Sequence, residues 1–325
     1  MPKILVILPI SIAGSLIMKG LAHAFNSCGY LAVTKDIREL KANDLEELEF
    51  STIVNYDYGF LHNEQITKYL QKNKKQYKII HYFADDPKSK YANDEDGKLY
   101  KELVKFNPYV FVWDKTYLNL FKKSKYLPLG VDPAAYEAEL FQKSLYDITF
   151  VGRPLGAKRQ KILSTLFKIY GAKLKIFSYE KHFYNGAEEM LKNGLLTQAE
   201  YEGFKRTFCG FVQTEKELAK IYSRSKVNLN ITIQGEDNMN YRVFEVLASA
   251  GFLLTDNQKC IQETFDIGKD LETYVNELEL VDKIDFYLKN VEIGQRIALQ
   301  GFDKVVNHHT FIDRARSLLA LVEHL

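Results

Sequence analysis

One segment of the chain has the composition of an anion-binding site. Gly152 follows a predicted strand, and three cations lead from it into the next predicted helix: Arg153, Lys158 and Arg159. The free N–H groups at a helix N-terminus and basic side chains both favour an anion such as a phosphate group. The alternative is a basic first helical turn that only makes surface salt bridges.

Two acids, Asp237 and Glu245, lie eight residues apart around the start of a second predicted helix. Because eight residues make about two helical turns plus a cap, we expect Asp237 at the mouth of the helix and Glu245 deeper. Glu245 interrupts the apolar run VFEVLASAG, where an unpaired carboxylate would be costly, and this favours a binding role. In the alternative interpretation, Asp237 is an ordinary N-cap and Glu245 is a surface charge.

Further polar residues crowd the start of the same helix: Asn238, Asn240 and Arg242. The planar guanidinium of Arg242 could clamp phosphate oxygens through paired hydrogen bonds. A structural salt bridge is the alternative for this arginine.

In the first half of the chain, Asp85 and Asp86 directly follow a predicted strand. Carboxylates at that place could position an acceptor hydroxyl or remove its proton. A turn built on the sequence Asp-Asp-Pro is an equal alternative. A metal site is disfavoured, because consecutive residues of a strand point to opposite faces.

The elements that must position these residues alternate between short β-branched or aromatic runs and helical patterns. Strands are predicted over residues 4–8, 30–33, 51–56, 78–83, 109–113 and 125–129, and again over 147–151, 174–177, 227–230 and 252–255. This alternation predicts parallel βαβ units, with helices on both faces of each sheet. Ligands of such sheets bind beyond the carboxyl ends of the strands, so the segments after strands, among them residues 57–58, are the places to examine.

Length and composition fit a two-domain globular protein. At about 150 residues per domain, 325 residues predict two domains. A hydrophobic content of 46% excludes a disordered chain, and 44 basic against 42 acidic residues exclude the basic footprint of a nucleic-acid binder. Three scattered cysteines argue against a disulfide framework and a structural zinc site, and favour a cytoplasmic location.

The N-terminal segment could be taken for a signal peptide, because Lys3 precedes an apolar run and Ala-His-Ala follows it. Pro9 and Lys19 interrupt that run, so no span of about 20 apolar residues is available to cross a membrane. We expect instead a strand, a turn at residues 9–14 and a helix over 15–26, as at the start of nucleotide-binding α/β domains.

Five motifs of the second half occur in an order and spacing that cover most of residues 126–319. They are YLPLGVDPAAY (126–136), DITFVGRP…KRQKIL (147–163), YSRSKVNLNIT (222–232), NMNYRVFEVLASAGFLLTD (238–256) and HHTFIDRARSLL (308–319). The first half adds HYFADDP (81–87). Together these motifs resemble the CgeB-like glycosyltransferases, named for a spore-maturation protein, within the two-domain GT-B enzymes.

This resemblance implies an α/β fold of the GT-B type: two doubly wound Rossmann-like domains, residues 1–140 and 141–305, facing across a cleft, with a C-terminal helix at 306–325 that packs back on the first domain. It implies transfer of a sugar from a nucleotide-sugar donor on the second domain to an acceptor hydroxyl on the first, with retention of configuration and without a metal or other cofactor. The acceptor would be a glycan, a lipid-linked sugar or a protein. A sugar-nucleotide epimerase or hydrolase, and a non-catalytic sugar-nucleotide- or glycan-binding protein, are the alternatives.

The resemblance also implies roles for the candidate residues. The cations around Gly152 would contact the donor diphosphate, Glu245 the ribose, and the region of Asp237 the donor sugar. The expected donor-binding residues are Gly14, Gly152, Arg153, Lys158, Arg159, Phe211, Val212, Asp237, Asn238, Asn240, Arg242 and Glu245, and the expected catalytic residues are Asp85, Asp86 and Arg242. Gly14 lies in a small-residue loop that lacks the G-x-G-x-x-G pattern. Phe211 and Val212 would face the nucleobase or pack in the core.

Two further features have ordinary explanations. His308 and His309 are adjacent, so they diverge on a helix and are not expected to bind a metal. A basic run over residues 68–78 indicates a solvated helix face. It could also meet an acidic acceptor, or bring the protein into peripheral contact with the inner face of an anionic membrane.

Overall fold

The computed structural model describes residues 2–47, 49–88, 97–106, 108–140, 143–233 and 237–323, with side chains up to residue 320. Within these residues the chain forms two compact units. Unit 1 comprises Met1–Asp132, Gln234–Met239 and His309–Leu325, and unit 2 comprises Pro133–Ile233 and Asn240–His308. The expected boundary between residues 140 and 141 falls at a segment, 141–142, outside the described residues.

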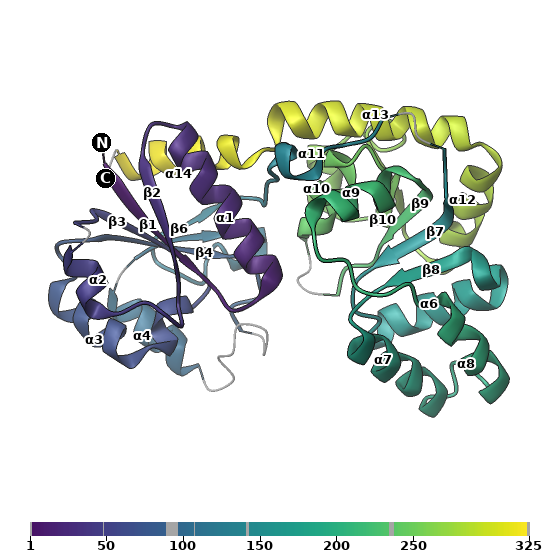
Figure 1. The fold of residues 1–325 in the computed structure, drawn as a ribbon, viewed down its shortest axis with the longest axis horizontal. Coiled ribbons are helices and arrows are strands. Elements are labelled where there is room, and N and C mark those ends of the chain that lie inside the picture. Colours follow the sequence, from purple (N-terminus) through teal and green to yellow (C-terminus); the bar gives the residue numbers. More distant parts are fainter. Residues whose placement is uncertain are drawn as a thin grey trace. The chain divides into compact units, whose positions relative to one another are not determined.

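Unit 1 contains a parallel sheet with the strand order β2-β1-β3-β4-β5-β6. Its strands are β1 (Lys3–Leu8), β2 (Leu31–Asp36), β3 (Thr52–Tyr56), β4 (Lys78–Phe83), β5 (Tyr109–Val112) and β6 (Ser124–Tyr126). Its helices are α1 (Ile12–Ser27), α2 (Ala42–Glu47), α3 (Glu64–Asn73), α4 (Lys98–Phe106) and α14 (Phe311–Glu323). The order reverses direction at β1, which lies between β2 and β3, as a doubly wound sheet requires (Figure 1).

Helix α1 begins earlier than predicted, at Ile12 rather than at residue 15. The reason is Ser11, whose hydroxyl accepts a hydrogen bond from the N–H of Gly14 (N–O distance 3.3 Å) and so caps the helix. Gly14 therefore lies in the first turn of α1 rather than in a loop. The prediction that Gly14 belongs to a loop was wrong.

Unit 2 contains a second parallel sheet with the order β11-β10-β9-β7-β8. Its strands are β7 (Tyr146–Val151), β8 (Leu174–Phe177), β9 (Ser225–Asn230), β10 (Leu253–Asp256) and β11 (Glu272–Tyr274). Its helices are α5 (Pro133–Tyr136), α6 (Ala157–Tyr170), α7 (Glu180–Lys192), α8 (Gln198–Phe204), α9 (Glu215–Ser223), α10 (Tyr241–Ala248), α11 (Lys259–Thr264), α12 (Glu277–Lys289) and α13 (Val291–His308). The prediction missed the short strand β11.

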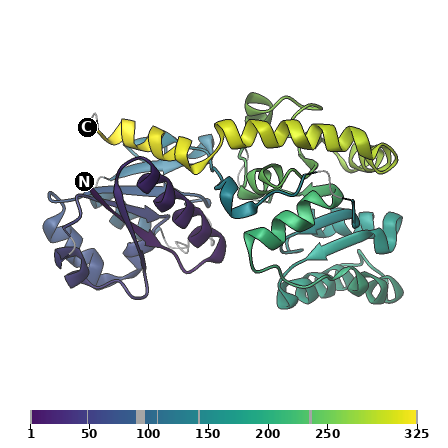
Figure 2. The ribbon, with the colours of Figure 1, turned by 45° about the horizontal axis from the view of Figure 1, so that its top comes forward.

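Each sheet has its own apolar core. In unit 2, Ile148, Phe150, Val227 and Leu229 of β7 and β9 are buried among the helices that cover the sheet. The long helix α13 runs along the outside of this unit, where it contacts α10 and α12 (Figure 2). The predicted fold class, two α/β units built on parallel sheets, is confirmed. Among the helices of the described residues, we find none that is both long and apolar enough to span a bilayer.

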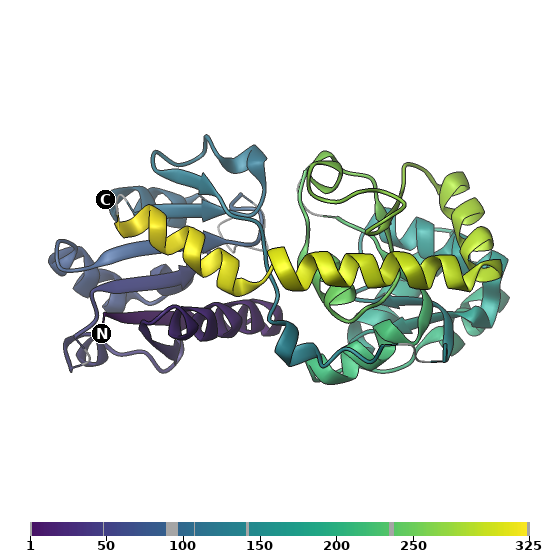
Figure 3. The same ribbon diagram turned by 90° about the horizontal axis from the view of Figure 1, so that it is seen from above.

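The last helix, α14, belongs to unit 1 and packs along α1 (Figure 3). The N–H of Phe311 donates to the carbonyl of Val131 (2.9 Å), and the buried Arg314 donates through Nε to the carbonyl of Leu129 (3.1 Å). At the α1 contact, a Cβ placed on Gly20 would lie 2.4 Å from the ring of Phe311. Gly20 thus allows the two helices to approach closely.

The Gly20→Ala variant tests this packing. We expect it to lower the free energy of unfolding by about 1–3 kcal/mol, because the added methyl must displace Phe311. Urea denaturation gives the value, and Lys19→Ala, on the exposed face of the same helix, should change it by less than about 0.5 kcal/mol. Adding Phe311→Leu to Gly20→Ala should restore part of the loss. No difference between the Gly20 and Lys19 variants would contradict the contact.

Candidate functional site

The candidate site of unit 2 lies at the carboxyl edge of its sheet. Strand β7 lies between β8 and β9, so the strand order reverses at β7. In doubly wound sheets, this reversal leaves a crevice beyond the strand ends in which ligands bind. The segment after β7, the end of β9 and the first turn of α10 therefore determine the chemistry of this edge.

Gly152 directly follows β7 and has a positive φ of 149°. A Cβ at this position would lie 3.0 Å from Nη1 of Arg242, so glycine, which the positive φ also favours, lets the guanidinium lie at the strand end without being displaced. Nε of Arg242 donates to the hydroxyl of Tyr222 (3.3 Å), which fixes the direction of the side chain. The structure thus brings together two residues that the sequence predicted separately, Gly152 and Arg242.

Arg159 has a different environment from the one expected for a phosphate ligand. It is only 8% exposed. Its Nε donates to the carbonyl of Ile231 (2.9 Å) and its Nη1 to the carbonyl of Arg153 (3.2 Å). These bonds join the segment after β7 to the segment after β9 across the crevice. Arg159 therefore positions the backbone of the site.

Lys158 lies at the exposed start of α6, which follows Gly156, a residue with no side chain to cap the first helical turn. The half-exposed ammonium of Lys158 is 3.2 Å from Oδ2 of Asp256, at the end of β10. Asp256 is itself fixed, because it accepts hydrogen bonds from the N–H of Thr232 (2.9 Å) and the hydroxyl of Tyr274 (2.7 Å). Lys158 is thus a cation held over the strand ends and open to solvent. Arg153, also exposed, precedes it.

Glu245 is buried, with 6% of its surface exposed, so the alternative of a surface charge was wrong. The hydroxyl of Tyr136 donates to its Oε1 (3.0 Å). Burial raises the pKa of Glu245 above its usual value, although the nearby Arg242 guanidinium and the Tyr136 hydrogen bond oppose the rise. Tyr136 comes from α5, far away in the sequence, and belongs to the motif YLPLGVDPAAY. Sequence analysis did not single it out.

The polar residues before α10 are divided between the two units. Asn240, and not Asp237, is the N-cap of α10, so the alternative of an Asp237 N-cap was wrong. Nδ2 of Asn240 donates to Oδ1 of Asn230 (3.0 Å), and its Oδ1 is buried with no partner among the described residues. Asp237 and Asn238 belong to unit 1, where Nδ2 of Asn238 is 3.4 Å from Oδ2 of Asp114.

Two aromatic rings form an exposed stack beyond β8. The ring of Phe211 is 41% exposed and lies 3.7 Å from the ring of Tyr179, nearly parallel to it at 16°. Phe211 is therefore not a core residue, and Val212 beside it is half-buried. Next to the stack, Ser178 Oγ and His182 Nδ1 are buried without a hydrogen-bond partner in the described part of the chain. Burial lowers the pKa of His182, and the charge of Arg153 lowers it further.

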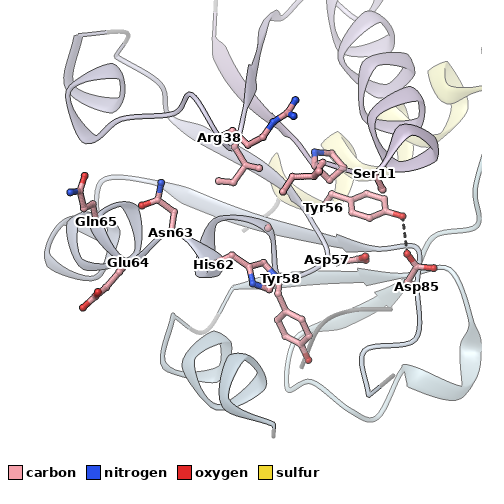
Figure 4. A pocket seen from close by; sticks show the side chains of 14 residues that line it. Ser11, Arg38, Tyr56, Asp57, Tyr58, His62, Asn63, Glu64, Gln65 and Asp85 are labelled. Atoms are coloured by element: carbon pink, nitrogen blue, oxygen red, sulfur yellow. Dashed lines mark hydrogen bonds between the residues drawn. The ribbon is translucent and has the colours of Figure 1, made fainter. Parts of the chain in front are cut away.

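In unit 1, the structure separates the two acids that follow β4. Asp85 lines a cavity of about 820 Å³ and accepts a hydrogen bond from Tyr56 (Figure 4). Asp86 accepts a hydrogen bond from the N–H of Lys88 (2.9 Å) and so closes the Asp-Asp-Pro turn. In the sequence, residues 57–58 stand out only as a segment that follows a predicted strand, and Asp57 lines the same cavity.

No cluster of three or more His, Cys, Asp or Glu residues within the described ranges is arranged to hold a metal ion. His309, one of the two adjacent histidines near the C-terminus, has its Nδ1 2.9 Å from Nη2 of Arg314. This contact links it to the anchor of α14 in unit 1.

A sequence model described as glycosyl transferase-like matches residues 153–320, which is more than half of the chain. The chain belongs to this glycosyl transferase-like family. The match begins at Arg153 and includes the α6 start, α10 and Glu245. No curated protein matches the chain in sequence.

Solved structures match the fold over the whole chain at low sequence identity. A glycosyltransferase from Rickettsia africae aligns with 99% of this chain and 98% of its own, with a TM-score of 0.68 and 13% identity. Sucrose-phosphate synthase from Thermosynechococcus elongatus aligns with 100% of this chain and 99% of its own, with a TM-score of 0.70 and 13% identity. HepE of Anabaena, solved in complex with UDP and glucose, covers 100% of both chains, with a TM-score of 0.66 and 10% identity. The fold is that of the GT-B glycosyltransferases.

The burial of Glu245 predicts a pH-dependent stability. A carboxyl group whose pKa is raised by folding destabilises the folded state once it ionises. The free energy of unfolding of the wild type, relative to that of Glu245→Gln, should therefore fall as pH rises from 4 through the raised pKa, and then level off. Urea denaturation at several pH values measures this difference.

The control has the opposite sign. Glu200 accepts a hydrogen bond from the N–H of Thr197 in a capping box, and this bond lowers its pKa. The free energy of unfolding of the wild type, relative to that of Glu200→Gln, should therefore rise as pH rises from the lowered pKa to the ordinary value of 4.5, and should stay constant above it. If the Glu245 difference followed the Glu200 difference, the carboxyl of Glu245 would not be buried as described.

Proposed function

We propose that the protein is a glycosyltransferase that moves a sugar from a nucleotide-sugar donor to an acceptor hydroxyl, with unit 2 as the donor-binding unit. The observation that carries this proposal is the pairing of Gly152 and Arg242 at the end of β7, where a guanidinium reaches the strand end in the absence of a side chain. Family membership and the fold support the same activity. We keep the CgeB-like subtype as part of this proposal.

The cations supply the chemistry that the leaving group needs. Departure of a nucleoside diphosphate leaves negative charge on its phosphate oxygens, which fixed positive groups stabilise. Arg242, Lys158 and Arg153 are assigned this role, and the start of α6 adds the partial positive charge of a helix N-terminus. In this proposal no metal ion or other cofactor takes part, because side chains provide the positive charge.

Carboxylate, aromatic and amide groups complete the donor site. Glu245 is assigned to the ribose hydroxyls, and Asn240 to the donor through its unpartnered Oδ1. The nucleobase is assigned to the Phe211 stack, where Ser178 and His182 offer unpartnered polar atoms to its edge. HepE, which shares the fold, has been solved with UDP-glucose. We therefore take uridine diphosphate as the first nucleotide to test.

The remaining parts of the proposal concern the reaction partners. The acceptor, a glycan, a lipid-linked sugar or a protein, binds unit 1, and the protein acts in the cytoplasm, with peripheral membrane contact in the lipid-linked case. Within the donor site, we assign no carboxylate as a nucleophile to form a glycosyl-enzyme intermediate. Attack from the face that the leaving group vacates then retains the anomeric configuration.

Nucleotide binding tests the donor site. Isothermal titration with UDP, GDP and ADP should give one preferred nucleotide whose affinity is unchanged by EDTA. Arg242→Ala should weaken that affinity about 10- to 100-fold, because a charge-assisted hydrogen bond contributes about 1.5–3 kcal/mol. Arg224→Ala is the matched control. Arg224 forms an ion pair with Glu139, and its backbone carbonyl accepts a hydrogen bond from the N–H of Tyr146 at the start of β7, the opposite end of that strand from Gly152. Equal losses in the two variants, or loss of binding in EDTA, would contradict the assignment.

The stereochemical outcome tests the mechanism. With an α-linked donor such as UDP-glucose and water as acceptor, proton NMR of the first product should show α-glucose before mutarotation. β-Glucose as the first product would establish inversion and contradict the proposal. Epimerised donor would favour the epimerase, and donor turnover that no acceptor accelerates would favour the hydrolase. Nucleotide-sugar binding without any turnover would leave a binding protein.

A further inference from the structure

The cavity of about 820 Å³ in unit 1 lies at the carboxyl edge of its sheet (Figure 4). The segments that line it follow β1, β2, β3 and β4, and all of them belong to unit 1. Its volume is in the range of small-molecule sites, which run from about 300 to 1,000 Å³. A sugar of one or two rings fits such a volume.

Asp57, at the floor of this cavity, is held in an unusual backbone conformation. Its φ is +45°, a value that non-glycine residues rarely adopt. The carbonyl of Asp57 accepts hydrogen bonds from Nδ1 of the buried His81 (2.6 Å) and Nδ2 of the buried Asn55 (3.1 Å). A Cβ on Gly59 would lie 2.1 Å from Oδ1 of Asn55, so this network also requires a glycine nearby. Three neighbours therefore maintain the backbone conformation at Asp57.

Asp85, two residues beyond β4, lines the same cavity and is close enough to Asp57 for its charge to act on that carboxyl group (Figure 4). The hydroxyl of the buried Tyr56 donates to Oδ2 of Asp85 (3.3 Å). Tyr56 can take this position because a Cβ on Gly14 would lie 2.9 Å from its ring, and Gly14 has none. The N–H of Ala84 donates to Oδ1 of Asp57 (3.0 Å), which fixes the second carboxyl group of the pair.

Burial acts strongly on one of the two carboxyl groups. Asp57 is only 7% exposed, and burial raises its pKa well above the usual range, with the charge of Asp85 adding to the rise. Burial therefore favours the neutral, hydrogen-bond-donating form of Asp57. A neutral carboxyl group donates a hydrogen bond and a carboxylate accepts one. The pair can thus offer one hydroxyl group both a hydrogen-bond donor and a hydrogen-bond acceptor.

The walls of the cavity favour an uncharged ligand over a phosphate. Arg38, the arginine of the lining, is bound to Asp36 through two hydrogen bonds, so the Asp36 carboxylate offsets its charge. A phosphate would instead meet the Asp85 carboxylate. Pro9, Ile10 and Ile37 add an apolar side, which suits the C–H face of a sugar ring.

We propose that this cavity binds the acceptor as an uncharged sugar, with one of its hydroxyl groups held between Asp57 and Asp85. This inference rests on the proposed glycosyltransferase activity and names the class of its acceptor. Asp57 and Asp85 act here as binding and positioning residues.

Ligand-observed NMR tests the proposal on the full chain. The probes are methyl glycosides of glucose, galactose and mannose, with glucose 6-phosphate and glucosamine as charged comparisons. At least one neutral glycoside should bind. Its dissociation constant should rise at least about tenfold in Asp85→Asn, which loses a charged acceptor. It should change less than about threefold in Asp57→Asn, because an amide donates as the neutral acid does and asparagine tolerates a positive φ.

Two controls make the result decisive. Glu39→Gln removes an exposed carboxylate that follows β2 outside the cavity lining, and should leave glycoside binding unchanged. UDP affinity, measured on the same samples, reports on unit 2 and on folding, and should be equal in all variants. Glycoside binding to a protein that binds none of UDP, GDP and ADP would refute the proposed donor and leave the sugar site standing.

Other outcomes overturn the inference itself. Binding of glucose 6-phosphate or glucosamine in preference to the neutral glycosides would assign the cavity to a charged ligand. Unchanged binding in Asp85→Asn, or an equal loss in Asp57→Asn and Asp85→Asn, would refute the shared role of the pair. Failure of every neutral glycoside to bind to a protein that binds UDP would refute the sugar site.

Discussion

Within each sheet the strands are parallel. The carboxyl ends of all its strands, and the segments that follow them, therefore lie along one edge of that sheet. This constraint concentrates polar residues that are distant in sequence. At that edge of unit 2, Gly152 follows β7, the Ile231 carbonyl follows β9 and Asp256 ends β10. In unit 1 the same edge collects Asp57 and Asp85. The chemistry of both sites follows from the parallel arrangement.

Charged groups at these edges are buried, and burial is costly unless each group has a partner. Arg159 satisfies two carbonyls, Glu245 has the Tyr136 hydroxyl, and Asp256 has Tyr274 and Thr232. Such partners fix the direction of each side chain before a ligand arrives. A site of fixed dipoles and charges needs little reorganisation when new charge develops, which is the requirement for stabilising a leaving group.

Most of the strands and the burial of Glu245 could be predicted from the sequence. The β-branched runs predicted the strands of both sheets apart from β11, and the apolar surroundings of Glu245 predicted that this carboxylate is not an ordinary surface charge. Gly152 and the basic residues after it marked the end of β7, beside which the structure places Arg242. Periodicity and residue type carry this information because both act over a few neighbouring positions.

The side-chain contacts at the candidate sites depend on partners that are distant in the sequence, and the sequence does not reveal those partners. Tyr136 and Glu245 are more than 100 residues apart, so nothing local indicated their hydrogen bond. In the sequence, Arg159 and Lys158 are adjacent cations with the same expected role. In the structure, Arg159 donates to a backbone carbonyl, whereas Lys158 is half exposed. The positive φ of Asp57 results from His81 and Asn55 on two different strands, and residue types alone do not predict such a backbone conformation.

Hydrogen exchange of the full chain, measured by mass spectrometry with and without saturating UDP, tests most directly whether unit 2 holds the donor. We expect slower exchange in peptides that contain the segment after β7, residues 152–160, and the first turn of α10, with no change in the segments that line the unit 1 cavity. If bound UDP protected the segments after β1, β3 and β4 and left residues 152–160 and α10 unchanged, the donor site would lie in unit 1 and the account would be wrong.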